Sequence, residues 1–218
     1  MSPTAVRLMA AVFLVGGVAL MFGLWMGQRQ PAAPAPAALM QDRHITVLPE
    51  ARPIPAFALL DHDGKPFGPE RLRDQWTFLF LGYTHCPDVC PTTLATLARM
   101  QQRLAPAPGT PARVVLVSVD PGRDDTARLK EYVTHFHKDF TGVTGPGQEI
   151  DKLVSALGAM YVLHNATGEK DYPVDHTAAV FLVDPTGGFK ALFSPPLDAA
   201  AMAERFSRLQ KQWRERRE

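Results

Sequence analysis

Two cysteines, Cys86 and Cys90, are the residues of this chain whose type and spacing most clearly indicate chemistry. They are the only cysteines among 218 residues, and they lie in the segment Gly-Tyr-Thr-His-Cys-Pro-Asp-Val-Cys-Pro at 82–91. If a helix begins there, residues four positions apart share one of its faces, about one turn from each other. Two such thiols can close a disulfide or bind a soft metal ion, and buried structural thiols are the plainer alternative.

The segments on either side place the cysteine pair where a strand passes into a helix. Residues 76–81 are almost all apolar or aromatic, which is typical of a strand buried on both faces. Residues 92–104 repeat apolar side chains every three or four positions, which predicts a helix, and Pro91 suits its first turn. Because a helix N-terminus stabilises negative charge, we expect thiolates to be favoured over thiols at both cysteines.

The rest of the chain alternates strand and helix patterns. Short strand signals lie at 56–60 and after a turn at 63–64, further strands are expected at 113–119, within 174–183 and at 189–193, and further helices at 125–136, at 148–157 and around Met202, Phe206, Leu209 and Trp213. This order predicts a three-layer α/β domain with a mixed central sheet. The arrangement is that of a thioredoxin-like domain, with the cysteines at the carboxyl edge of the sheet, where open α/β folds place their sites.

A metal site needs a further ligand, and His176 is the leading candidate among seven histidines. It precedes the expected strand at 178–183, and in a thioredoxin-like sheet the loop entering that strand lies beside the cysteine pair. Two thiolates and one imidazole make a soft site of low coordination number, suited to Cu(I) and usable by Cu(II) with an added ligand. A single loop histidine can equally be structural, so the residues alone leave both interpretations open.

Other polar residues near these positions have simpler interpretations. His85 could tune the pKa of Cys86, but we expect it to face away because adjacent side chains point apart. Asp175 could orient the imidazole of His176, although the same objection applies to it. Asp88 could be an outer carboxylate or cap the start of the helix. The remaining histidines form no constellation in the sequence: His44, His62, His135, His137 and His164.

The N-terminal part of the chain has the pattern of a membrane anchor. Residues 8–26 carry no charge and are flanked by Arg7 and Arg29, a length that can cross a bilayer core. A buried helix is the alternative. The expected organisation is an anchor at 1–29, a Pro/Ala-rich linker at 30–43 and a single domain at 44–218. The net charge of +1 gives no indication of a nucleic-acid partner.

Three segments together resemble the Sco/SenC proteins, copper-binding assembly factors for cytochrome c oxidase. They are the cysteine segment 82–91, the segment Ser118-Val119-Asp120-Pro121 with Arg123-Asp124, and the segment Tyr172-Pro173-Val174-Asp175-His176-Thr177. They occur in family order across roughly residues 50–210. The resemblance implies a thioredoxin-like fold and copper held by Cys86, Cys90 and His176.

The resemblance also implies partners and a function. The expected target is the oxidase subunit that carries the dinuclear copper centre CuA, and another copper-donor protein and a thioredoxin-like reductant are further partners. The leading hypothesis is a copper chaperone, in which oxidation of the pair to a disulfide would release the metal. The alternative is a thiol–disulfide oxidoreductase that reduces the cysteines of that subunit with Cys86 and Cys90. A thiol peroxidase is disfavoured because the offset of Thr84 from Cys86 does not match the motif it requires.

The N-terminal segment also predicts where in the cell the protein is located. No Arg/Ser-rich transit peptide precedes the apolar residues, which favours a bacterial over a mitochondrial protein. We therefore expect a single-pass protein of the inner (cytoplasmic) membrane whose domain faces the periplasm.

Overall fold

The computed structural model describes residue 21 and residues 44–104, 112–164 and 171–216. All of these except Met21 lie in one compact unit, Met40–Glu218. The expected anchor at 1–29 and linker at 30–43 lie outside the described residues apart from Met21, and they stay predictions. Within the described ranges, no helix combines the length and apolar character that crossing a membrane requires.

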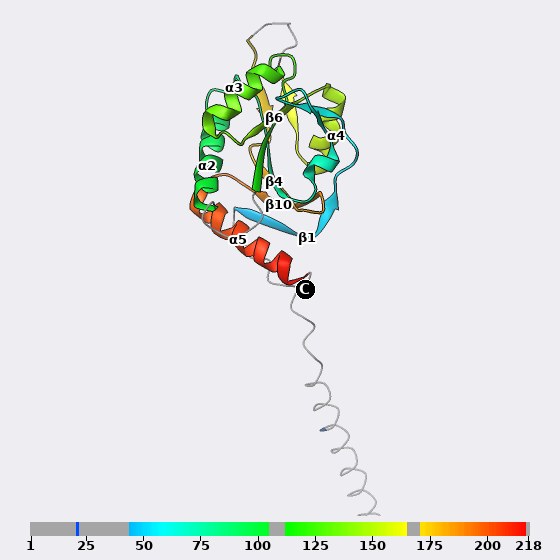
Figure 1. The fold of residues 1–218 in the computed structure, drawn as a ribbon, viewed down its shortest axis with the longest axis vertical. Helices are drawn as coiled ribbons and strands as arrows, with labels where there is room; N and C mark the ends of the chain where they lie inside the picture. The colour runs from blue at the N-terminus through cyan, green and yellow to red at the C-terminus, as the bar shows by residue number, and fades with distance from the viewer. Residues whose placement is uncertain (1–20, 22–43, 105–111, 165–170, 217–218) are drawn as a thin grey trace, which may run out of the picture. The chain divides into compact units, whose positions relative to one another are not determined.

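A mixed sheet forms the centre of the domain (Figure 1). Its eight strands, in spatial order, are β1 (Ile45–Pro53), β10 (Gly188–Phe193), β9 (Val180–Val183), β4 (Trp76–Gly82), β5 (Ala112–Ser118), β6 (Thr141–Thr144), β2 (Leu59–Asp61) and β3 (Pro66–Phe67). Strands β4, β5 and β6 are parallel to one another, and the other neighbours are antiparallel. A separate two-stranded sheet pairs β7 (Tyr161–Leu163) with β8 (Val174–His176).

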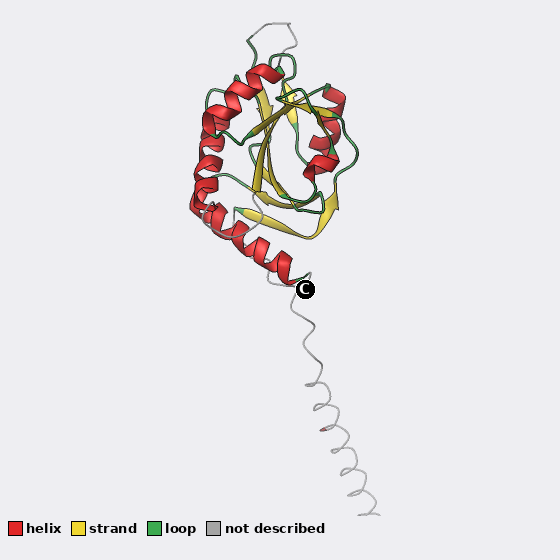
Figure 2. Ribbon diagram, viewed as in Figure 1, coloured by secondary structure: helices red, strands yellow, loops and turns green. Residues whose placement is uncertain are grey.

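Helices cover both faces of the sheet (Figures 1 and 2). The helices α2 (Val89–Leu104), α3 (Thr126–Phe136) and α5 (Ala199–Glu215) lie on one side, α4 (Gly147–Leu157) lies on the other, and the short 3-10 helix η1 (Pro69–Leu72) precedes β4. The parallel strands are joined through α2 and α3, as parallel pairs require. The result is the three-layer, thioredoxin-like arrangement that the sequence predicts.

Strand β4 is buried along its whole length because it lies between β5 and β9 in the middle of the sheet. Trp76 and Phe78 pack on Phe206 of α5, with ring centroids 5.6 Å and 5.0 Å apart. Complete burial of side chains of this kind stabilises a fold by about 1.5–3 kcal/mol each. Since the strand ends at Gly82, a tightly packed element leads directly into the cysteine segment.

Sequence patterns missed the strands β1, β6, β7 and β8. Strand β6 reads Thr-Gly-Val-Thr, so it has no apolar run that would indicate a strand in the sequence. It is a strand because it pairs with β5 on one side and β2 on the other. The strand expected at 178–183 is confirmed by β9, whereas β8 just before it is a separate strand. These two strands have different partners, since β8 pairs with β7 while β9 lies between β10 and β4.

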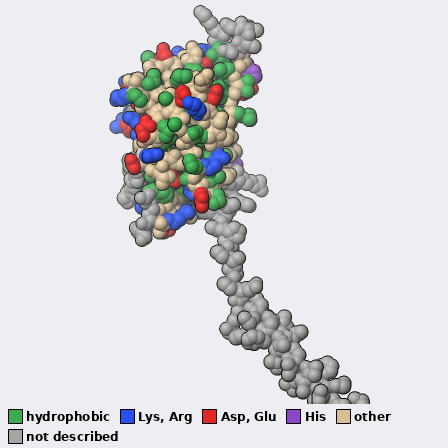
Figure 3. Space-filling view, turned by 90° about the vertical axis from the view of Figure 1, so that its right-hand side faces the viewer, with side chains coloured by type: hydrophobic (Ala, Val, Ile, Leu, Met, Phe, Trp, Pro, Cys, Tyr) green, Lys and Arg blue, Asp and Glu red, His purple; other side chains and the backbone are tan. Residues whose placement is uncertain are grey.

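The visible face of the molecule in Figure 3 carries mixed charges. Basic and acidic side chains are interspersed there with apolar ones, and no extended area of one sign stands out. This distribution agrees with the small net charge of the chain, +1. Electrostatic steering of a strongly charged partner therefore has no evident basis on this face.

Candidate metal centre

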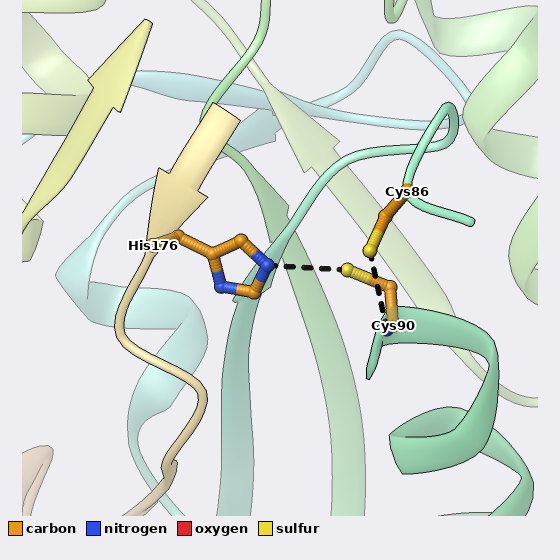
Figure 4. A group of neighbouring side chains, drawn as sticks. All are labelled: Cys86, Cys90 and His176. Atoms are coloured by element: carbon orange, nitrogen blue, oxygen red, sulfur yellow. Dashed lines mark hydrogen bonds between the residues drawn. The ribbon is translucent and has the colours of Figure 1, made fainter. Parts of the chain in front are cut away.

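Cys86, Cys90 and His176 converge on one point, as Figure 4 shows. The two Sγ atoms and the nearest imidazole nitrogen all lie within 4.8 Å of one another. The Nε2 atom of His176 is 3.4 Å from Sγ of Cys90, and Sγ of Cys86 accepts a hydrogen bond from the Cys90 N–H at 3.4 Å. Among the residues that the structure describes, no other group of three His, Cys, Asp or Glu side chains meets in this way.

The three side chains come from three different local structures. Cys90 is the second residue of α2 and is fully buried, whereas Cys86 precedes the helix and is 8 % exposed. The N–H of Cys86 donates to the carbonyl of Tyr83 at 3.3 Å, which turns the chain so that the first sulfur approaches the helix start. His176 is the last residue of β8. The sequence-based expectation that a helix starts beside the second cysteine is confirmed.

Aromatic rings and a carbonyl hold the imidazole of His176. Its ring meets Phe80 and Tyr83 edge-on, with centroid distances of 5.9 Å and 6.0 Å. Its Nδ1 atom lies 3.3 Å from the carbonyl oxygen of Thr177. A proton on Nδ1 would be donated to that carbonyl, which leaves the lone pair of Nε2 directed at the sulfurs.

Gly82 is required by the close packing beneath the sulfur of Cys90. A Cβ atom at this position would lie 2.9 Å from Sγ of Cys90, 3.0 Å from Cδ1 of Leu116 and 3.2 Å from Cε1 of Phe80. Contacts this short do not fit without movement of the neighbours. The glycine therefore lets strand β4 approach the sulfur closely.

The two thiols differ in acidity. The pKa of Cys86 is lowered to about 5, chiefly by a hydrogen bond from the Cys90 side chain, against the opposing effect of burial and with help from the N–H groups of Asp88 and Cys90. The same pairing and deeper burial raise the pKa of Cys90. The expectation of thiolates at both positions is therefore wrong for the metal-free protein. One thiolate and one thiol share the site, because two adjacent buried negative charges would repel each other.

The donor set fits a soft metal ion. Ligands bound at about 2.0–2.3 Å, as zinc binds nitrogen and sulfur, can be at most about 4.6 Å apart. The observed limit of 4.8 Å between ligand atoms thus leaves only a small adjustment for an ion to be held by all three. Two sulfurs and one imidazole suit Cu(I) in particular, and binding would displace the proton of Cys90.

Residues that sequence analysis considered around the site lie elsewhere. His85 has its Nδ1 atom 3.2 Å from Oγ1 of Thr84 and 3.8 Å from a carboxylate oxygen of Asp124, and no contact with a sulfur is seen. Asp175 does not orient His176, because adjacent residues of β8 face opposite ways. Its Oδ2 atom is instead 2.8 Å from Nε2 of His164, a pair that the sequence did not suggest.

Asp88 is exposed, so it is not part of a buried shell around the sulfurs. Its carbonyl oxygen accepts from the N–H of Thr92 at 3.2 Å, a contact of the first helical turn. The other histidines outside the site include His62, whose Nδ1 atom accepts from the N–H of Gly142 at 3.1 Å. These residues have local structural roles.

Sequence reasoning gave no role to a group of buried polar residues beside the site. Asp120 and Asp124 are 1 % and 0 % exposed, and they contact residues on both sides of the metal centre. The available signal was their place in the segment around 118–124, which contributed to the family resemblance. Periodicity does not reveal them, because they lie in a loop.

Comparison with known proteins identifies the family. A family model described as SCO1/SenC matches residues 47–211. The chain belongs to the SCO1/SenC family. The family that the sequence analysis predicted from three short segments is therefore confirmed.

Individual relatives agree with this assignment. The SCO1/SenC chain is 36% identical over 160 residues to the "Putative copper-binding protein" of Stutzerimonas stutzeri, which covers 73% of this chain and 78% of that protein. It is 34% identical over 153 residues to the mitochondrial "Protein SCO2 homolog" of Mus musculus. That alignment covers 70% of this chain and 60% of the mouse protein.

Two solved structures of relatives share the fold. The copper-bound ScoI of Arabidopsis thaliana matches with a TM-score of 0.68 and 31% identity over 72% of this chain and 98% of that one. The copper-bound ScoI of Bradyrhizobium japonicum matches with a TM-score of 0.63 and 31% identity over 72% and 98%. The thioredoxin-like fold of this SCO1/SenC chain is thus confirmed.

Proposed function

We propose that this chain is a copper chaperone that holds one copper ion with Cys86, Cys90 and His176. It delivers the ion to the CuA centre of a cytochrome c oxidase subunit. The observation that carries the proposal is the convergence of two sulfurs and one imidazole nitrogen within 4.8 Å. Two relatives at 31% identity have solved structures with copper bound, which supports copper as the metal. The oxidase subunit as target follows from the family resemblance.

The unequal acidity of the two thiols suits capture and release of the ion. The thiolate of Cys86 is present at neutral pH and is the more exposed sulfur, so it meets an incoming ion first. Binding then displaces the proton of the buried Cys90, and His176 supplies the third donor atom. Three ligands leave room for a thiolate or imidazole of the partner to bind before the first ligand departs, which permits transfer by stepwise exchange.

The proposal includes a membrane anchor at 8–26 and a domain in the periplasm. The support is the uncharged run of residues 8–26 and the short Pro/Ala-rich segment that follows it. A tether of this kind keeps the domain near a membrane-bound target and raises its effective concentration there.

A second function, reduction of the partner's cysteines, is favoured by the free thiols and the acidity of Cys86. Both cysteines are reduced in the structure, and the pKa of Cys86 is lowered to about 5. Its thiolate would attack a disulfide sulfur of the partner, forming a mixed disulfide and releasing one partner thiolate. Cys90, after giving its proton to the first released partner thiolate, would attack Sγ of Cys86 and release the second thiolate of the partner. The partner gains two electrons, and this chain keeps a disulfide.

Copper titration of the full chain under anaerobic conditions tests the proposal. The reduced chain is expected to bind one equivalent of Cu(I) and the oxidised, disulfide form none. Mixing the loaded chain with a metal-free CuA-bearing oxidase subunit is then expected to produce the visible absorption of CuA. Absence of binding in either redox state would refute the chaperone, and undiminished disulfide reduction by a His176→Ala variant would then support the oxidoreductase.

A further inference from the structure

The loop that follows β5, residues 119–124, contacts both segments that supply metal ligands. It carries two carboxylates that are almost fully buried, Asp120 and Asp124. Burial of carboxylates costs free energy unless they are paired and hydrogen-bonded. The hydrogen-bond and ion-pair partners of these two carboxylates therefore indicate which segments the loop holds in place.

On one side the loop binds the segment that carries His176. The hydroxyl of Tyr172 donates to Oδ1 of Asp120 at 2.6 Å. The guanidinium of Arg123, which forms an ion pair with the same carboxylate, lies over the Tyr172 ring with its Cζ atom 3.6 Å from the centroid. Tyr172 is four positions before His176. These contacts attach the histidine segment to the loop.

Arg123 also reaches the cysteine segment. Its Cζ atom lies 5.6 Å from the ring centroid of Tyr83, and that ring meets the imidazole of His176 edge-on at 6.0 Å. One guanidinium is thus placed between two tyrosine rings, one from each half of the centre. Cation–π contacts of this kind are worth about 0.5–2 kcal/mol each, with the larger values where solvent is excluded. The side chain of Arg123 is only 11 % exposed.

Asp124 holds the cysteine half from the other end of the same loop. Its carboxylate accepts from the N–H and the hydroxyl of Thr84 at 3.0 Å and 2.6 Å, and from the hydroxyl of Ser118 at 2.7 Å. Thr84 is two positions before Cys86. The loop therefore binds both segments that supply metal ligands, and Arg123 is the side chain that touches aromatic residues of both.

We propose that Arg123 is a positioning residue for copper. Together with Asp120 and Tyr172, it fixes the distance between His176 and the cysteine pair before the metal arrives. If the histidine segment became ordered only when copper bound, the entropy lost in ordering it would reduce the affinity for copper. A segment that folding already holds in place avoids this loss and binds copper more tightly. The inference rests on the proposed copper function and adds a determinant of its affinity.

The test is the Cu(I) affinity of the full chain, measured by competition with a chromophoric chelator. Arg123→Lys keeps the charge but loses the planar group that stacks on the rings. We expect it to weaken binding by about tenfold to 100-fold, as loss of partners around metal ligands typically does. Tyr172→Phe removes a single hydrogen bond and should weaken binding roughly fivefold. The matched control is Arg208→Lys, an exposed arginine paired with Glu204, which should change affinity by less than about twofold.

Repeating the comparison in a His176→Ala background separates positioning from general damage to the fold. If Arg123 acts through the imidazole, Arg123→Lys causes less than about a twofold further loss in that background. An equal loss in both backgrounds, or no loss in a folded Arg123→Lys protein, overturns the inference. Should Arg123→Lys fail to fold, Tyr172→Phe decides by the same cycle. A parent chain that bound no copper would refute the proposed function itself, whereas failure of the arginine comparison alone leaves that function standing.

Discussion

The Nε2 atom of His176 lies 3.4 Å from Sγ of Cys90, although 86 positions separate the two residues in the chain. The contact exists because β8 leads into β9, and β9 pairs with β4, the strand that runs into the cysteine segment. The complete set of three ligands is therefore a property of the folded domain. Metal binding and folding are coupled for this reason.

Loss of the imidazole should separate copper retention from folding. Because His176 supplies one of three donor atoms, His176→Ala is expected to reduce Cu(I) affinity by more than about 100-fold. This exceeds the loss of about tenfold to 100-fold that is typical when a residue supporting a metal ligand is removed. Chelator competition measures the affinity, and circular dichroism checks the fold. His164→Ala is the matched control, since this exposed histidine pairs with Asp175 and does not touch the sulfurs. Equal affinity in the His176 variant and the parent would show that the site is assigned wrongly.

The reactivity of Cys86 should show its lowered pKa directly. In the reduced, metal-free chain the thiolate is fully formed above about pH 6, because the pKa is lowered to about 5. The rate of alkylation by iodoacetamide is therefore expected to stay level from pH 6 to 8 and to fall below pH 5. Mass spectrometry of the labelled peptide measures it. The chain unfolded in guanidinium is the control, where the rate should rise through an ordinary thiol pKa of about 8.5. A similar rise in the folded chain would contradict the prediction.

Gly82→Ala should damage both stability and the metal site. The added Cβ meets Sγ of Cys90 at 2.9 Å with no free space on either side. Overpacking of this kind costs about 1–3 kcal/mol of unfolding free energy. For a domain of this size, each kcal/mol corresponds to a fall in Tm of about 2–4 °C. Gly147→Ala is the control because nothing lies within 4 Å of a Cβ at that position. A Tm for Gly82→Ala equal to that of the control variant would refute the close packing.

Copper should stabilise the reduced chain and leave the oxidised one unchanged. A ligand that binds only the folded state adds about 2.7 kcal/mol at 100 times its Kd. Thermal unfolding with and without Cu(I) measures the shift in Tm, and the disulfide form is the comparison because its sulfurs are no longer available. The same shift in a Cys86→Ser, Cys90→Ser double variant would mean that copper binds elsewhere.

Sequence patterns alone determined the local part of this account. The apolar run at 76–81 and the helical spacing at 92–104 were sufficient to place Cys86 and Cys90 between a buried strand and a helix, and β4 and α2 confirm it. Patterns of this kind report burial and backbone period within one segment. The family resemblance rests instead on three short segments, and it implied that His176, already the leading candidate for a third ligand, completes the set.

Tertiary structure decided what depends on contacts between distant segments. It paired Asp175 with His164 instead of His176, and it placed Arg123 between Tyr83 and Tyr172. It also made the two thiols unequal, since the hydrogen bond between them lowers the pKa of Cys86 and raises the pKa of Cys90, while burial raises both. Strand order and burial bring these groups together, and neither can be predicted from the spacing of residues within a single segment. The cysteine pair was visible in the sequence, whereas its division into one thiolate and one thiol required the fold.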